Sequence, residues 1–364
     1  MRELEEKILT HITNRGPITF SDFMEMVLYD RDYGYYSVVA ERIGPAGDYY
    51  TSANVAAEFG ALLAQQCLEM RAQLGTERLV IVEIGAGTGQ LAFDILTALI
   101  AEHHLSAQEI EYLICETSPA MQARQAEKLE RFTTQVRWVN YQALASAPIE
   151  GVIISNEVVD ALPVHRVKWQ GRRLRELFVT AAGTGLQTEW YKPSTLQLGA
   201  YLQRFDIRLE EGQIAEINLN AIVWLQQVAA ALRRGFVITI DYGDLVDHLY
   251  APDHQEGTLR CFYRHTLNDE PLARVGEQDI TADVNFSALI DYGQEFGLET
   301  VRLARQADYL IRLGLLDRLQ HMIENCQEDF TSLKARLALK NFFVPGGISD
   351  HFKVLIQQKG LKDS

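Results

Sequence analysis

The sequence predicts an α/β fold built around a largely parallel sheet. The first observation is the almost continuous apolar run Leu79–Ile84, which leads directly into three glycines at alternate positions, Gly85, Gly87 and Gly89. A strand covered on both faces of a parallel sheet shows such a run instead of an alternation. The second observation is that further apolar runs alternate with segments of helical spacing, at 111–115, 151–155 and 235–241. Alternating strands and helices are typical of α/β folds.

The first 75 residues are more than a linker needs, and they read as helical. Residues 2–14 carry apolar side chains on one face, and Gly16-Pro17 ends that helix. A second helix follows at once, with Thr19 or Ser21 as its cap. The stretch 44–52 contains two glycines and a proline before a polar, aromatic segment, and we interpret it as a lid. A third helix is expected over residues 54–70.

The glycine loop predicts a nucleoside-binding turn. Glycines let the backbone turn sharply and approach a ligand closely, and the segment from Gln90 has helical spacing. The loop lacks the Lys-Ser/Thr of a phosphate-binding P-loop and misses the Gly-x-Gly-x-x-Gly dinucleotide spacing by one place. Glu83 would repel a pyrophosphate but can pair with an ammonium group, which favours a cationic nucleoside such as S-adenosylmethionine. The alternative is a structural turn of any α/β protein.

The second strand ends in an acidic residue. Glu116 follows the apolar run 111–115, and an acidic residue at that strand tip accepts hydrogen bonds from ribose hydroxyls in nucleoside-binding α/β folds. Ser118-Pro119 then reads as a helix start. A carboxylate here is often only solvated, but the glycine loop beside it favours the functional interpretation.

The third and fourth strands end in polar residues as well. Residues 135–139 read as a short strand, and Asn140 would lie beside an adenine if the order of strands holds. The fourth strand, 151–155, runs into Asn156, Glu157 and Asp160. Ligands of open α/β folds bind at the C-terminal edge of the sheet, so this tip is where we expect the chemistry.

The second half of the chain interrupts the α/β pattern before completing it. Residues 166–179 alternate around a glycine-containing turn, as a hairpin does, and their arginines are more often a solvated face than a binding site. The spacing at 219–232 predicts a helix. Residues 235–243 again show an apolar strand that ends in an acidic residue and is followed by a glycine. Residues 244–285 have little regular pattern, and 257–265 and 279–286 are the parts that look ordered. Helix 287–296, strand 300–303, a mostly helical segment 306–339 and an antiparallel last strand 351–359 complete the chain.

Composition excludes several classes of protein. A chain of 364 residues with 47% hydrophobic residues can bury a sizeable core. The net charge of −15 argues against a general nucleic-acid-binding surface. The four cysteines lie far apart, which suggests neither a zinc site nor a disulfide framework. The acidic, amphipathic N-terminus is unlike a signal or transit peptide, and no apolar run is long enough for a membrane span, so we expect a cytoplasmic location.

Four phrases of the sequence resemble one known family. They are Gly47–Ser52, Glu83–Gly89, Ser155–Pro163 and Phe352–Lys359, and they resemble the MidA family of class I S-adenosylmethionine-dependent methyltransferases over nearly the whole chain. The chain departs from the family at Ala53-Asn54, where members often carry Pro-Glu. The resemblance implies a seven-stranded Rossmann-like sheet and S-adenosyl-L-methionine as cofactor. It also implies methyl transfer to an arginine of a partner protein, with a respiratory complex subunit as one candidate.

The candidate site residues follow from the motifs together with this resemblance. Those expected to bind the cofactor are Glu83, Gly85, Gly87, Gly89, Glu116, Ser118, Asn140 and Thr51. The catalytic candidates are Glu157 and Asp160, with Asn156 as an orienting partner. Carboxylates that bind a guanidinium bidentately can aim one nitrogen at the methyl donor and localise the charge on the others. Weaker candidates for lining the site are Asp48, Asp241, Tyr242 and His265.

Other functions remain open at this point. The chain could be an assembly factor for a respiratory complex, which would bind the cofactor but whose main role would be to bind a partner. It could also be a methyltransferase for a small molecule. An NAD-dependent enzyme is disfavoured by the glycine spacing and Glu83. The predicted organisation is an N-terminal extension with lid (1–75), a cofactor-binding core (76–164, 216–243, 286–304 and 345–360), an antiparallel insertion (165–215) and substrate-side insertions (244–285 and 305–344).

Overall fold

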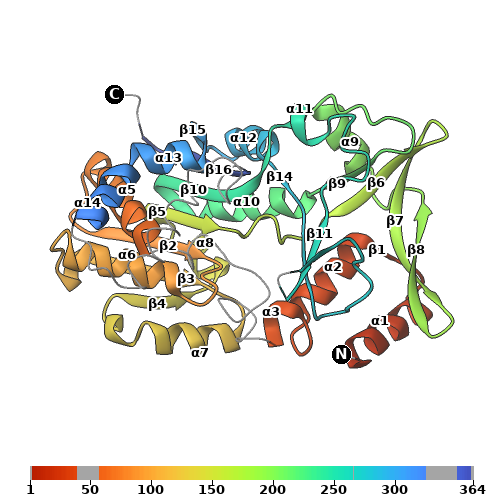
Figure 1. Ribbon diagram of the computed structural model, residues 1–364, viewed down its shortest axis with the longest axis horizontal. Coiled ribbons are helices and arrows are strands. Elements are labelled where there is room, and N and C mark those ends of the chain that lie inside the picture. Colours follow the sequence, from red (N-terminus) through yellow and green to blue (C-terminus); the bar gives the residue numbers. More distant parts are fainter. Residues whose placement is uncertain (1, 39–56, 265, 325–350, 362–364) are drawn as a thin grey trace.

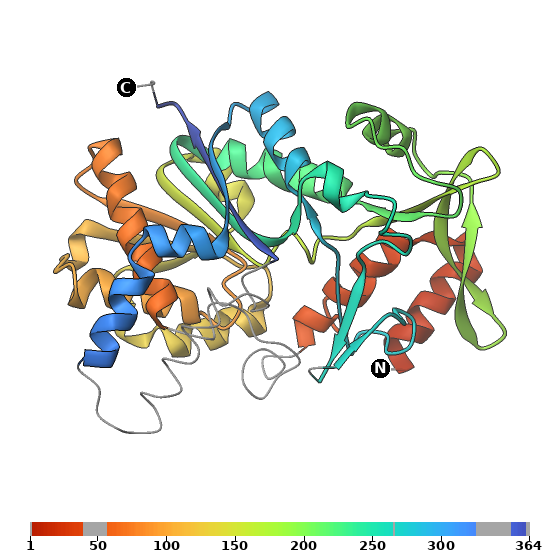
Figure 2. The same cartoon turned by 45° about the horizontal axis from the view of Figure 1, so that its top comes forward.

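The main sheet and a second sheet lie toward opposite ends of the molecule (Figures 1 and 2). The architecture comes from a computed structural model that describes residues 2–38, 57–264, 266–324 and 351–361. The predicted lid at 44–52 and the end of the helical segment after residue 324 lie outside the described residues. Among the described residues, no helix is both long and apolar enough to cross a membrane.

The main sheet has the predicted mixed topology. Its strand order is β15-β16-β10-β5-β2-β3-β4, and a two-residue strand, β14, also pairs with β10. The strands are β2 (Leu79–Ile84), β3 (Ile110–Cys115), β4 (Val136–Val139), β5 (Ile149–Asn156), β10 (Leu232–Asp244), β14 (Val284–Asn285), β15 (Glu299–Arg305) and β16 (Phe352–Lys359). Parallel pairing joins β4, β3, β2, β5 and β10. The last strand, β16, is antiparallel to both neighbours, which confirms that prediction.

Helices cover both faces of the main sheet, which explains the near-continuous apolar strands. One face packs against α5 (Ala57–Leu74), α6 (Gln90–Ala101), α13 (Gln306–Arg312) and α14 (Leu315–Glu324). The other face packs against α8 (Tyr141–Ser146), α10 (Leu219–Ala231) and α12 (Phe286–Glu295). The connection from β3 to β4 contains α7 (Pro119–Lys128), which begins at the predicted Ser118-Pro119. Two short 3₁₀ turns, Ala107–Glu109 and Glu130–Phe132, complete this part.

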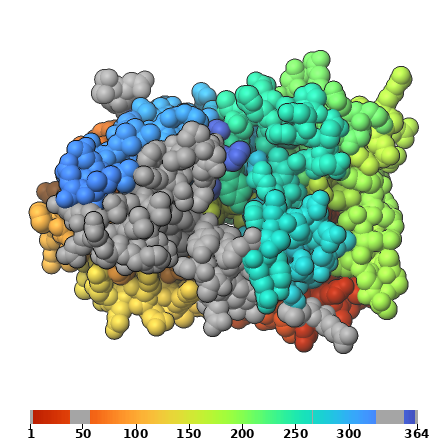
Figure 3. Space-filling view, viewed as in Figure 1, coloured from red at the N-terminus to blue at the C-terminus, as the bar shows by residue number. Residues whose placement is uncertain are grey.

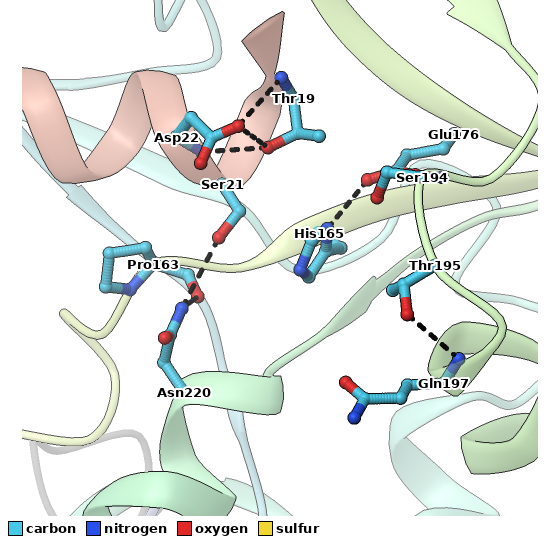
Figure 4. Close-up of polar contacts among 10 residues, drawn as sticks. All are labelled: Thr19, Ser21, Asp22, Pro163, His165, Glu176, Ser194, Thr195, Gln197 and Asn220. Carbon is cyan, nitrogen blue, oxygen red and sulfur yellow. Dashed lines mark hydrogen bonds and ion pairs between the residues drawn. The ribbon is translucent and has the colours of Figure 1, made fainter.

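The second sheet is antiparallel and contains the predicted hairpin. Its order is β1-β7-β6-β9, and β8 pairs with residues 176–182 of β7. The strands are β1 (Ile18–Thr19), β6 (His165–Gln170), β7 (Arg173–Ala182), β8 (Gly185–Tyr191) and β9 (Ile214–Ile217). One cluster of buried residues joins it to α1 (Arg2–Arg15), α2 (Phe20–Tyr29) and α3 (Tyr35–Val38), and another joins it to α9 (Gln197–Arg204). Thr19 caps α2 in a capping box with Asp22, so the cap is Thr19 and not Ser21 (Figure 4).

Residues 244–285 lie between the two larger sheets. They contain α11 (Val246–Leu249) and a small antiparallel sheet of β11 (Arg260–Tyr263), β12 (Thr266–Asn268) and β13 (Asp279–Thr281). Figure 3 shows this segment in teal, beside the green strands of the second sheet. The two parts predicted to be ordered, 257–265 and 279–286, contain β11 and β13, whereas β12 was not predicted.

Candidate active site

The glycine loop after β2 adopts a backbone that side chains rarely tolerate. The φ angles are +66° at Gly85, +51° at Gly87 and +79° at Gly89, all in the left-handed region. A Cβ atom added at Gly85 would lie 2.9 Å from a methyl of Val158, so this turn abuts the segment that follows β5. At Gly87 an added Cβ would meet no atom of the described residues within 4 Å. The loop can therefore bring backbone groups close to a ligand.

Glu116 lies beside this loop and is held by three donors. Its Oε1 accepts the N–H groups of Thr117 (2.8 Å) and Ser118 (2.9 Å), and its Oε2 accepts Gln125 Nε2 at 3.1 Å. The same Gln125 amide donates to Gly87 O at 2.9 Å. A carboxylate has about four acceptor positions, so the fixed Glu116 retains capacity for a ligand hydroxyl.

Glu83 is buried directly before the glycine loop. Its carboxyl group is 3% exposed and accepts the Tyr112 hydroxyl at 2.7 Å. Burial raises the pKa of Glu83 to about 7, against the lowering effect of the Tyr112 hydrogen bond. A cation placed beside this group would favour its ionised form.

The remaining predicted cofactor residues have capping roles in the structure. Ser118 Oγ accepts Met121 N at the start of α7, and Asn140 Oδ1 accepts Ala143 N at the start of α8. Asn140 stands directly after β4 and Ser118 three residues after β3, at the edge where β2 also ends. These caps fix the two residues without using the Asn140 amide N–H donors. Thr51, Asp48 and His265 lie outside the described residues.

The tip of β5 brings together the predicted catalytic residues. Asn156 Nδ2 donates to Glu157 Oε1 at 3.1 Å, and Glu157 has a φ of +54°. Asp160 is 3% exposed and accepts the Tyr242 hydroxyl. Among the described residues, Asn156 Oδ1 and Asp160 Oδ1 are buried and accept no hydrogen bond. Buried acceptors in native proteins usually have a partner, so these two oxygens are suited to a donor-rich ligand.

Carboxylates concentrate around this tip. Burial raises the pKa of Asp160 to about 6, while the Tyr242 hydroxyl lowers it. Asp241, at the end of the neighbouring β10, is fully buried, and this burial together with the nearby Asp160 and Glu157 carboxylates raises its pKa well above the usual value. The Tyr36 hydroxyl donates to a further carboxylate, Asp279 Oδ1, at 2.7 Å. The site is therefore rich in carboxyl groups, and burial favours the protonated forms of Asp160 and Asp241.

The family of the chain follows from a comparison of its sequence with family models. A model described as "Putative S-adenosyl-L-methionine-dependent methyltransferase" matches residues 62–304, which is more than half of the chain. The chain belongs to this methyltransferase family. The match contains the glycine loop, Glu116 and the β5 tip.

Solved structures and curated relatives agree with this assignment. A protein from Burkholderia thailandensis, described as a "likely methyl transferase" and solved with bound S-adenosyl-homocysteine, is 30% identical with a TM-score of 0.90, covering 100% of this chain and 93% of that one. The mouse "Protein arginine methyltransferase NDUFAF7, mitochondrial" is 29% identical, over 88% of this chain and 76% of its own length. The human protein of that name is 25% identical, over 88% and 75%. The resemblance to the MidA family is thus confirmed.

The methyltransferase depends on S-adenosyl-L-methionine, and the residues at the sheet edge fit that cofactor. Bound there, the cofactor supplies an electrophilic methyl group on a sulfonium. The left-handed glycines allow close backbone approach, and the fixed carboxylate of Glu116 can accept hydroxyl donors. Gln125 was not predicted from the sequence, although it donates hydrogen bonds to both the glycine loop and Glu116. Its position within a helix carries no local signal of that contact.

Proposed function

We propose that this methyltransferase methylates arginine side chains of a partner protein. One observation carries the proposal: the β5 tip combines the Glu157 carboxylate with two buried oxygens, Asn156 Oδ1 and Asp160 Oδ1, that accept no hydrogen bond from the part of the chain that the structure describes. A guanidinium offers five N–H donors in a planar fork and a permanent positive charge. The names of the mouse and human relatives support the same acceptor. A respiratory complex subunit stays a candidate partner.

The chain's own residues would perform three tasks. Glu157 and Asp160 would bind the guanidinium and aim one nitrogen toward the methyl donor, so that proximity and alignment lower the barrier. Binding the other nitrogens would localise the positive charge away from the attacking one. The attacking nitrogen must lose a proton, and Asp160, with a pKa of about 6, is ionised at neutral pH and could accept it. The departing sulfide needs no proton.

Transfer of a labelled methyl group to proteins tests the proposal. The chain is incubated with labelled S-adenosylmethionine and a lysate from cells that lack it, and modified residues are identified by mass spectrometry. We expect methylarginine with the unmodified chain and a loss of orders of magnitude with Glu157→Gln, while affinity for S-adenosyl-homocysteine stays near normal. Glu150→Gln is the control, since Glu150 lies in β5 at the end opposite to Glu157 and pairs with Arg233 and Arg234.

Other outcomes would contradict the proposal in separable ways. Label on small molecules only would point to a different acceptor class. Unchanged transfer by Glu157→Gln would refute the role of that carboxylate. Complementation of a deletion strain by a Gly87→Val variant that binds no cofactor would favour an assembly factor over an enzyme.

A further inference from the structure

The segment 157–163, between β5 and β6, is held by many hydrogen bonds although it contains no helix or strand. It carries Glu157 and Asp160 and connects the main sheet to the second sheet. Its N–H groups and its carbonyl groups are bound by different parts of the chain. The N–H side is bound by β10, and the carbonyl side by α10, α2 and the residue after β13.

Asp241 binds the N–H side. Its Oδ2 accepts three consecutive backbone N–H groups, those of Val158 (3.2 Å), Val159 (2.9 Å) and Asp160 (3.3 Å). Its Oδ1 accepts the N–H of Tyr242 at 3.0 Å. Successive backbone N–H groups that converge in this way form an anion-binding concavity. Here a carboxylate of the chain itself occupies it.

The carbonyl side is bound by side chains of two helices and one backbone group. Asn218 Nδ2 donates to the carbonyls of Val159 (3.2 Å) and Leu162 (3.3 Å), and Ala282 N to that of Asp160 (3.0 Å). The Tyr29 hydroxyl donates to Ala161 O at 3.0 Å. Asn220 Nδ2 donates to Pro163 O at 2.8 Å and lies between Pro163 and Ser21 of α2 (Figure 4).

The segment needs this support because it begins with an unfavourable backbone. Glu157 has a left-handed φ of +54°, which is unfavourable for a residue with a side chain and persists only where the surroundings fix it. Its N–H donates to Ile240 O, the residue before Asp241, at 2.9 Å. The next residue, Val158, packs against Gly85 of the cofactor loop. A shift of this segment would therefore move Glu157 relative to the glycine loop.

We propose that Asp241 is a positioning residue for methyl transfer, which fixes Glu157 by accepting the N–H groups of the three residues that follow it. The consequence for catalysis rests on the proposed function. Asp241 acts through the backbone it binds, and the oxygen that it presents to the N–H groups matters more than its charge.

Two substitutions separate position from charge. Asp241→Ala removes all four accepted bonds, whereas Asp241→Asn keeps an oxygen for the three N–H groups and loses the bond from Tyr242. Asp94→Ala is the control, because Asp94 is also buried, at 6% exposure, but its carboxylate accepts from Gln90 on its own helix. Backbone hydrogen exchange of residues 158–160 and the initial rate of labelled methyl incorporation into lysate proteins are measured for each full-length variant.

For Asp241→Ala we expect exchange at residues 158–160 to accelerate at least tenfold and methyl incorporation to fall at least a hundredfold. For Asp241→Asn we expect both to stay within about fivefold of the unmodified chain, and for Asp94→Ala exchange at these residues to stay unchanged. These expectations follow from the number of accepted hydrogen bonds that each variant loses, four in Asp241→Ala and one in Asp241→Asn.

Three results would overturn the proposal. Unchanged exchange in Asp241→Ala would show that Asp241 does not hold the segment. Faster exchange with undiminished transfer would show that the segment does not position Glu157. A more than hundredfold loss of transfer in Asp241→Asn, with the amides of residues 158–160 still protected from exchange, would mean that the charge of Asp241 acts directly. This variant tests the proposal even if Asp241→Ala does not fold. Absence of transfer by the unmodified chain would instead count against the proposed function, while exchange would still report on Asp241.

Discussion

Gln125 Nε2 lies 2.9 Å from Gly87 O, and this contact links α7 to the middle of the glycine loop. The same amide reaches Glu116 Oε2 at 3.1 Å, and Gln125 Oε1 accepts Trp138 Nε1 at 2.9 Å. Gln125 is fully buried. One side chain thus fixes the glycine loop and the acidic strand tip relative to each other.

Replacing Gln125 should weaken cofactor binding. Gln125→Leu removes three hydrogen bonds and leaves Trp138 Nε1 without its acceptor, and we expect affinity for S-adenosyl-homocysteine to fall about tenfold or more, by calorimetric titration. Gln122→Leu is the control, since Gln122 lies on the same helix and donates only to the backbone carbonyl of Glu116 at 2.7 Å. Equal affinities of the two variants would contradict the role of Gln125.

A pair of glycines separates cofactor binding from backbone strain. Gly87 and Gly183 have similar left-handed φ angles, +51° and +60°, and at either position an added Cβ would meet none of the described residues within 4 Å. Valine at either position should cost about 1–2 kcal/mol of stability. We expect Gly87→Val alone to abolish S-adenosyl-homocysteine binding, because Gly183 lies in the β7–β8 turn of the second sheet. Loss of binding in both variants would attribute the effect to folding.

Much of the main sheet was predictable because its strands are buried on both faces and read as apolar runs. The strand tips were predictable for the same reason, since polar residues directly after such runs must lie at the edge of the sheet. The small sheet β11–β12–β13 was predictable only as two ordered-looking segments, because strands of three or four residues show no reliable period.

Side-chain contacts between distant parts of the chain could not be predicted from the sequence either. The sequence places Asp160 at a strand tip but does not reveal that it is 3% exposed and bound by Tyr242, a residue of a strand 82 positions away. Gln125 is similar, since its partners Gly87, Glu116 and Trp138 belong to three other parts of the chain. Such contacts depend on tertiary packing and leave no mark on local periodicity.

Cofactor affinity should depend on pH through Glu83. The pKa of Glu83 is raised to about 7, so the free carboxyl group is largely protonated at pH 6 and ionised at pH 8. If the cofactor's ammonium group lies against Glu83 as we predict, binding favours the ionised form. The affinity for S-adenosyl-homocysteine, which retains that ammonium, should then rise about tenfold from pH 6 to pH 8. Calorimetry should also detect proton release near pH 7.

Glu83→Gln provides the control for this dependence. Because the variant cannot ionise, we expect weaker binding at pH 8 and no affinity change from this group between pH 6 and pH 8. The folded carboxyl binds its proton more tightly than the unfolded one, so its contribution to stability is lost as pH rises from about 4.5 to 7. Unfolding at pH 8 should therefore show the cofactor-free Glu83→Gln chain more stable, by up to about 3 kcal/mol. The same pH dependence in both chains would place the ammonium elsewhere.

The rate of methyl transfer should depend on pH through Asp160. Its pKa is about 6, and the role that we propose for it as guanidinium binder and proton acceptor needs the ionised form, so transfer should be present above pH 6 and lost as pH falls through that value. The Tyr242 hydroxyl donates to Asp160 and lowers this pKa. Tyr242→Phe should therefore move the acid limb of the rate profile to higher pH. The measurement is the initial rate of labelled methyl incorporation between pH 5 and pH 9.

Tyr29→Phe distinguishes this effect from a general loss of packing. Tyr29 is buried near the same tip, but its hydroxyl donates to a backbone carbonyl, that of Ala161, at 3.0 Å. Its removal should lower the rate at all pH values without moving the acid limb, because no hydrogen bond to a carboxylate is lost. An acid limb that stays in place in Tyr242→Phe, or that moves equally in Tyr29→Phe, would mean that a group other than Asp160 limits transfer at low pH.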